Sequence, residues 1–300
     1  MRTENSFLNA VNVLLTVLGL FLIAFLAVFV MDLIKRKDEK EHTNFLISGT
    51  IGMIANFFDT LGIGSFAIAT SLLRFFKQIE DRVLPGTLNV GCCIPVMTEA
   101  FLFISRIEVE PITLVSMLSS ATAGAYLGAG IVSKLPTKTV QRVMAFALAV
   151  TGTIVVLQLT GILPTANEES VVIGLSGAKL FIGIFVNFIL GALMTAGIGL
   201  YAPCLALVIF LGMNTRAAFP IMMASCAFLM PVASIKFVKE GAYNKKASLA
   251  IAMLGVPGVL IAYKFFEGLS LYMLKWLVVT VMIYTSITLL AASRKNQETA

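Results

Sequence analysis

Charged residues are scarce in this chain of 300 residues. Asp, Glu, Lys and Arg make up 13% of it, against about 25% in a typical soluble domain. Hydrophobic residues make up 58%, and the mean hydropathy is +0.95. Apolar runs of about twenty residues, the length that crosses roughly 30 Å of hydrocarbon, recur along the whole chain. The composition excludes a soluble globular protein and predicts an all-α integral membrane protein, a polytopic helical bundle.

The chain also lacks the residues on which most enzymes depend. Its only histidine, His42, lies in the charged stretch KRKDEKEHTN. The chain therefore offers no suitable histidine for a histidine-dependent nucleophile or for His-ligated zinc or haem. The four cysteines lie in apolar segments, where they are expected to pack as small residues. No GxxxxGK[ST] motif is present to bind ATP. We therefore expect no enzyme activity, no catalytic residue, no cofactor and no metal.

Basic residues outnumber acidic ones, 22 to 16. In a membrane protein such an excess marks cytoplasmic loops, so the expected partner is the lipid bilayer and not nucleic acid. The sequence leaves open whether copies of the chain form a homo-oligomer.

The first apolar segment, residues 7–34, is too long for a signal peptide and is followed by a basic cluster at 35–37. Residues 1–36 are therefore predicted to form an extra N-terminal transmembrane helix that begins outside the cytoplasmic membrane. The further apolar segments are 45–76, 86–104, 111–133, 138–160, 175–211, 217–238, 246–266 and 270–292. Residues 293–300 are predicted to be a cytoplasmic tail.

Two of these segments are longer than one crossing needs, and glycines interrupt them, in TLGIGSFA at 60–67 and TAGIGLYA at 195–202. At an offset of 135 residues, eight of 26 ungapped positions are identical. Chance would explain the shared Leu, Ala and Phe, but two spaced glycines and a matching proline favour duplication. The identical pairs are Thr60–Thr195, Gly62–Gly197, Ile63–Ile198, Gly64–Gly199, Ala67–Ala202, Leu72–Leu207, Phe75–Phe210 and Pro85–Pro220. Repeat 1 is then 45–160, the linker 161–177 and repeat 2 178–292.

Counting basic residues predicts that the two repeats are inverted. If each broken segment crossed the membrane once, the two sides would carry 11 and 10 Lys and Arg residues. If each segment enters and returns, the counts become 16 inside and 5 outside, which agrees with the positive-inside rule. Each repeat then makes an odd number of crossings, so the two have opposite orientations, as in many secondary transporters.

Each glycine break is expected to line a cavity, because unpaired backbone at membrane depth is tolerated only inside protein or beside water. A short helix follows each break, at 66–76 and 201–211, and its N-terminal amides suit a small anion. The alternative is that the glycines only allow close helix packing. The predicted substrate-binding residues are Asn56, Thr60, Gly62, Gly64, Ser65, Thr87, Asn89, Thr195, Gly197, Gly199, Tyr201 and Pro203.

Asp59 precedes the first break, and an ionisable residue at that depth is a functional candidate. A carboxylate repels a bound anion unless it is protonated, so Asp59 is the predicted proton-coupling residue; Met194 takes its place in repeat 2. The open alternative is that Asp59 caps the short helix that follows. Glu99 is expected near the end of its segment, where it would pair locally or reach the membrane interface.

The motifs DTLGIGSFA at 59–67, PGTLNVG at 85–91 and GIGLYAP at 197–203 resemble the sulfite exporter TauE/SafE family, also called the toluene-sulfonate uptake permease family, over about 45–292. The resemblance implies a multi-pass permease of the cytoplasmic membrane that moves sulfite, sulfonates or related organosulfur anions. Two positions depart from the family pattern: Ile68 stands where the second copy has Pro203, and Ser65 where glycine is common.

These observations predict a secondary transporter that moves a small anion by alternating access, driven by protons or by the membrane potential. An anion channel is the nearest alternative, because the same helix dipoles could form a filter. An intramembrane hydrolase is a third; it would need two facing carboxylates, and only Asp59 and Glu99 lie within predicted spans.

Overall fold

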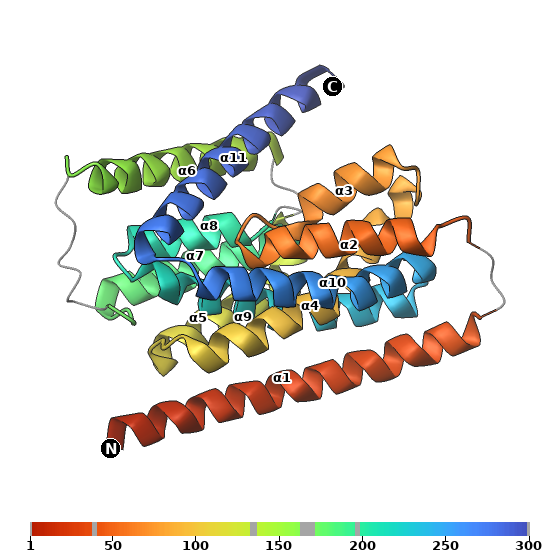
Figure 1. The fold of residues 1–300 in the computed structure, drawn as a ribbon, viewed down its shortest axis with the longest axis horizontal. Coiled ribbons are helices and arrows are strands. Elements are labelled where there is room, and N and C mark those ends of the chain that lie inside the picture. The colour runs from red at the N-terminus through yellow and green to blue at the C-terminus, as the bar shows by residue number, and fades with distance from the viewer. Residues whose placement is uncertain (1, 38–40, 133–136, 163–171, 196–198, 299–300) are drawn as a thin grey trace.

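The computed structural model describes residues 2–37, 41–132, 137–162, 172–195 and 199–298. Within these residues the chain is all-helical (Figure 1). Seven of the described helices are long and apolar enough to cross a membrane, which confirms the predicted class of membrane protein. The helices are α1 (Arg2–Lys35), α2 (Phe45–Thr60), α3 (Ser65–Phe75), α4 (Leu84–Arg106), α5 (Pro111–Val132), α6 (Thr137–Leu159), α7 (Gly177–Thr195), α8 (Tyr201–Phe210), α9 (Thr215–Lys239), α10 (Lys245–Glu267) and α11 (Leu271–Glu298), with a 3-10 turn at Asp81–Val83.

Both glycine-broken segments form hairpins that enter the bundle and return. The hydroxyl of Thr43, just before α2, donates to the carbonyl of Gln78, just after α3, at 2.9 Å. The amide of Asn214, after α8, donates in the same way to the carbonyl of Val172, before α7, at 2.9 Å. The α2–α3 hairpin enters from the right in Figure 1 and the α7–α8 hairpin from the left. This is the arrangement that the count of basic residues favours.

Helices from the first half of the chain pack mainly on helices from the second half. The main packing partner of α2 is α10 and that of α7 is α5, while α4 packs on α9 and α6 on α11. Glycines allow close approaches in two of these pairs: a Cβ on Gly258 would overlap the carbonyl of Met53, and one on Gly124 would overlap the carbonyl of Phe188. Met53 and Phe188 are separated by the 135 residues that also separate the glycine breaks. The packing therefore follows the same offset as the sequence.

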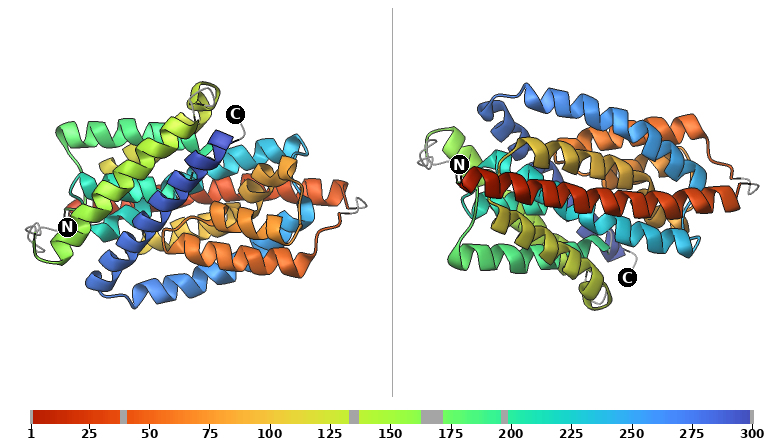
Figure 2. Two further views of the ribbon diagram at one scale, coloured as in Figure 1. Left: turned by 90° about the horizontal axis from the view of Figure 1, so that it is seen from above. Right: turned by 90° about the horizontal axis from the view of Figure 1, so that it is seen from below.

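Helix α1 has no counterpart in the second half and lies across one face of the bundle, where it packs mainly on α9 and α4 (Figure 2, right). Its buried face carries Leu18, Phe25 and Phe29. The ring of Phe21 meets that of Phe228 on α9 edge to face, with centroids 5.8 Å apart.

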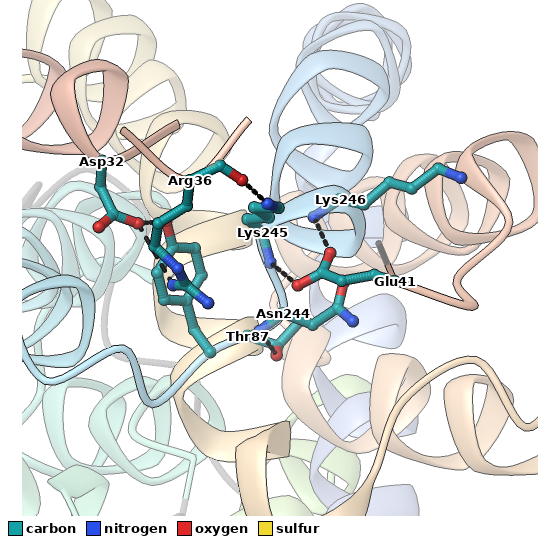
Figure 3. A network of polar contacts seen from close by, with 8 residues as sticks. Asp32, Arg36, Glu41, Thr87, Asn244, Lys245 and Lys246 are labelled. Carbon is teal, nitrogen blue, oxygen red and sulfur yellow. Dashed lines mark hydrogen bonds and ion pairs between the residues drawn. The ribbon is translucent and has the colours of Figure 1, made fainter. Parts of the chain in front are cut away.

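A network of polar contacts fixes the C-terminus of α1 at the end of the bundle formed by residues 36–37, 41–44, 74–87 and 239–246, which we call the basic end (Figure 3). The Tyr243 hydroxyl donates to Asp32 at 2.5 Å; burial, and then this hydrogen bond, raise the pKa of Tyr243. The Glu41 carboxylate accepts from the backbone amides of Lys245 and Lys246 at 3.0 and 2.7 Å, so it caps α10. The Lys245 ammonium donates to the carbonyl of Arg36. These bonds connect α1 to the start of α10.

Candidate functional site

The first residues of α3 and α8 border one small cavity. Its volume is about 30 Å³, which is room for a water molecule or two. It lies between the tips of the two hairpins, with α4 and α9 as its other walls. The lining residues are Asp59, Gly64, Ser65, Phe66, Val96, Met194, Gly199, Leu200, Tyr201, Cys226 and Met230. Both glycine breaks therefore face one cavity, as expected if each lines a site.

Asp59 caps helix α3. Its Oδ1 accepts from the backbone amide of Ser65 at 2.6 Å, and its Oδ2 accepts from the Ser65 hydroxyl at 2.9 Å. The chain can turn back this tightly because Gly64 has φ +93°, a region that favours glycine. The partial positive charge at the start of α3 stabilises the carboxylate. The capping alternative for Asp59 therefore describes its geometry.

Among the described residues, the start of α8 shows no equivalent carboxylate cap. Met194 occupies the position equivalent to Asp59, and the side chain of the N-cap residue, Leu200, forms no capping hydrogen bond. Pro203, in that turn, has no amide hydrogen, so the backbone donors at this helix start are the amides of Leu200, Tyr201 and Ala202. The two hairpin tips thus differ: at the first a carboxylate accepts directly from a backbone amide at the helix start, whereas at the second the carboxylate of Glu99 accepts from the Tyr201 hydroxyl.

Glu99 lies in the interior, so the expectation that it could reach the membrane interface was wrong. Its side chain is fully buried, with 0% exposed. Its Oε1 lies 2.9 Å from the Thr60 hydroxyl, and its Oε2 accepts from the Tyr201 hydroxyl at 2.9 Å. Glu99 therefore joins the tip of one hairpin to the tip of the other. Its neighbours come from α2 and α8, which the sequence of α4 alone could not reveal.

Four of the predicted binding residues line the cavity: Gly64, Ser65, Gly199 and Tyr201. Thr60 does not line it, but its hydroxyl and that of Tyr201 both bind the carboxyl group of Glu99.

The other predicted binding residues lie elsewhere or outside the described part of the chain. Gly62, with φ +94°, forms the first break beside buried α9 side chains. Asn56 donates to the carbonyl of Gly52 at 2.7 Å. Thr87 accepts from the Asn244 amide at the basic end, and Asn89 and Pro203 line two larger cavities. Gly197 and the side chain of Thr195 are not described.

The cavity walls that α4, α7 and α9 contribute were not predicted from the sequence. These are Val96, Met194, Cys226 and Met230. The Cys226 Sγ lies 3.6 Å from the Met194 Sδ. Cys226 and Met230 are four residues apart and so share a helix face, but α9 is buried over most of its length. Periodicity therefore could not distinguish these residues from ordinary core.

A larger cavity of about 990 Å³ runs between α1, α5 and α9. Its lining includes Asn89 and Lys236. Met194 lines both this cavity and the small one, so its side chain lies between them.

Asp59 and Glu99 do not share a hydrogen bond in the described structure: Ser65 binds the first, and Thr60 and Tyr201 bind the second. An aspartyl dyad needs two carboxylates that share a proton, which this arrangement does not provide. Among the described residues, no group of three or more His, Cys, Asp and Glu side chains could hold a metal ion.

Comparison with known proteins points to one family. The family model for the sulfite exporter TauE/SafE matches residues 5–155, half of the chain, from α1 to the end part of α6. No curated protein and no solved structure matches the chain. The matched half contains the first hairpin, Asp59 and Glu99. The chain therefore belongs to the sulfite exporter TauE/SafE family, a family of membrane transporters.

Proposed function

We propose that this chain is a secondary transporter that moves a small sulfur-containing anion, sulfite or a sulfonate, across the cytoplasmic membrane by alternating access. The observation that carries the proposal is the cavity between the two hairpin tips. Helix N-termini at membrane depth that face a shared cavity are a recurrent way to bind an anion in transporters.

The uncapped start of α8 is the proposed anion site. At the start of α3, the backbone amide and the hydroxyl of Ser65 already donate hydrogen bonds to Asp59. The anion therefore binds to the amides of Leu200, Tyr201 and Ala202 and to the Tyr201 hydroxyl. Met194, which is uncharged, allows an anion to approach where a carboxylate would repel it.

The cavity has to open for an anion to enter, because about 30 Å³ does not hold a sulfonate. The proposed route is the larger cavity, in which Lys236 and Asn89 offer a positive charge and hydrogen-bond donors. Movement of Met194 then joins the two cavities. Two inverted repeats would allow an equivalent opening toward the other side.

Uptake into proteoliposomes tests the proposal. The labelled anions are sulfite, thiosulfate, ethanesulfonate, sulfate and acetate, each with and without an imposed pH gradient. We expect saturable uptake of one sulfur anion and trans-stimulation by the same unlabelled anion, which a channel would not show. If folded protein moves none of these anions, the proposal is wrong.

The proposed topology places the N-terminus outside and the C-terminus in the cytoplasm, with the basic end facing inward. Single cysteines at Lys77 and Ser270, both exposed and at opposite ends of the bundle, test it in a variant without the four native cysteines. A membrane-impermeant maleimide is expected to label the Ser270 variant in intact cells and the Lys77 variant only after lysis. The reverse pattern would invert the topology.

A further inference from the structure

Glu99 belongs to a continuous series of hydrogen bonds that includes two hydroxyl groups, of Thr60 and Tyr201, and one backbone carbonyl, of Asn56. The Thr60 Oγ1 lies 2.9 Å from both the carbonyl of Asn56 and the Oε1 of Glu99. The other carboxyl oxygen of Glu99, Oε2, meets the Tyr201 hydroxyl at 2.9 Å. Glu99, Thr60 and Asn56 are fully buried, so bulk solvent does not reach these three residues.

Counting hydrogens shows that these hydrogen bonds can be satisfied in two protonation states of Glu99. Thr60 has one hydroxyl hydrogen and two acceptors within reach. When Glu99 is ionised, Thr60 and Tyr201 each donate to one of its oxygens. When Glu99 carries a proton on Oε1, it donates to Thr60, and Thr60 donates to the carbonyl of Asn56. No side chain has to move between the two states.

Tyr201 connects Glu99 to the cavity. Tyr201 is one of the residues that line the cavity, and its hydroxyl donates to Glu99. The hydroxyl has one hydrogen, so it can donate to Glu99 or to an anion in the cavity but not to both. An anion that takes this hydrogen bond leaves Oε2 of Glu99 without a donor and adds a second negative charge nearby. Both changes favour a proton on Glu99.

We propose that Glu99 takes up one proton when the anion binds, so that anion and proton move together and the protein is a symporter. The inference rests on the proposed transport function and names its coupling. The proton comes from solution and resides on Oε1 of Glu99, no covalent bond to the substrate forms, and both leave together on the other side. By linkage, a proton must strengthen anion binding as much as the anion strengthens proton binding.

The groups around Glu99 suit this role. The ionisable groups near Glu99 are Asp59 on α2, Tyr201 on α8, Cys226 on α9 and Cys92 on α4 itself. On α10, Tyr263 packs on Phe103, one turn further along α4. None of these groups is a cation that would hold Glu99 permanently ionised. Asp59 is less suited to the role, because both of its oxygens accept from Ser65 at the positive end of α3.

Proton uptake on anion binding tests the proposal directly. The full-length protein in detergent, in weak buffer with a pH-indicator dye, receives sodium thiosulfate or sodium ethanesulfonate, which stay ionised and do not buffer. Wild type is expected to take up about one proton per anion bound. Above the pH at which Glu99 ionises in the empty protein, the dissociation constant is expected to rise about tenfold per pH unit. Glu99→Gln is expected to bind the anion without proton uptake, at an affinity independent of pH.

Three variants make the result specific. Tyr201→Phe removes the hydroxyl that links anion and Glu99, so proton uptake per bound anion should fall well below that of wild type. Asp59→Asn tests the other carboxylate at the cavity: because Glu99 is still present, anion binding should still be accompanied by proton uptake. Ser234→Ala is the control, because Ser234 is the fully buried residue 135 positions after Glu99; it should behave as wild type.

The outcomes separate the two proposals. If neither anion binds to folded wild-type protein and none is transported, the proposed function fails and the inference with it. If wild type binds an anion without taking up protons, or if Glu99→Gln or Tyr201→Phe takes up as many protons as wild type, the coupling is wrong and the transport function stands. Loss of uptake in Asp59→Asn with uptake kept in Glu99→Gln would assign the proton to Asp59.

Discussion

Asp59→Ala is expected to abolish transport and to lower the melting temperature, whereas Asp59→Asn keeps most of both. Alanine removes both acceptors of Ser65 and leaves its amide buried without a partner, which costs about 1–3 kcal/mol. Asparagine keeps one oxygen for that amide, as it does at many helix N-termini. The start of α3 is therefore displaced in Asp59→Ala but not in Asp59→Asn.

Thermal unfolding and anion uptake of the purified variants measure this difference. Asp81→Ala is the matched control, because Asp81 forms an exposed ion pair with Arg74 at 2.7 Å, and such pairs contribute little to stability. Equal losses in Asp59→Ala and Asp59→Asn would mean that the charge of Asp59, and not its role as a cap, is what the protein requires.

Gly64→Ala is expected to impair transport through backbone strain alone. Gly64 has φ +93° and ψ +128°, a conformation that L-residues rarely adopt, and such strain costs about 1–3 kcal/mol. No atom lies within 4 Å of the position that a Cβ would take, so a steric clash does not contribute. The strain is relieved only if the first break changes its path, which displaces Ser65 from Asp59 and distorts the cavity.

Gly19→Ala is the control for the same chemical change. Gly19 also has open space around its Cβ position, but it lies within helix α1, where alanine is favoured by up to about 1 kcal/mol. The two variants should therefore shift the melting temperature in opposite directions, and only Gly64→Ala should lose uptake. Wild-type uptake and stability in Gly64→Ala would show that the break does not need this conformation.

The sequence was sufficient to predict the architecture but only part of the site. Apolar run length and the two GIG motifs predicted the helices and the breaks: the short helices expected at 66–76 and 201–211 are Ser65–Phe75 and Tyr201–Phe210. These signals are local, because each depends on residues adjacent in the chain. For the same reason the four cavity residues closest to the breaks, Gly64, Ser65, Gly199 and Tyr201, could be found.

The remaining site residues depend on helices that are distant in sequence. Glu99 was expected to pair locally or to reach an interface, because only its distance from the end of an apolar segment was known; its partners lie on α2 and α8. Thr87 was expected near the breaks because it follows the first one in sequence. In the fold it lies almost a full turn inside the start of α4, at the far end of the hairpin, where it accepts from Asn244.

The exchange of helices between the halves has a consequence for biogenesis. Helix α2 leaves the ribosome long before α10, its main partner, and α5 before α7. The first half therefore cannot complete its packing while it is synthesised, and α2 gains its main packing partner only when the last third of the chain has been made. A chain that stopped after α6 could satisfy these helices only by pairing with a second copy inserted the opposite way, because the two hairpins enter from opposite ends (Figure 1).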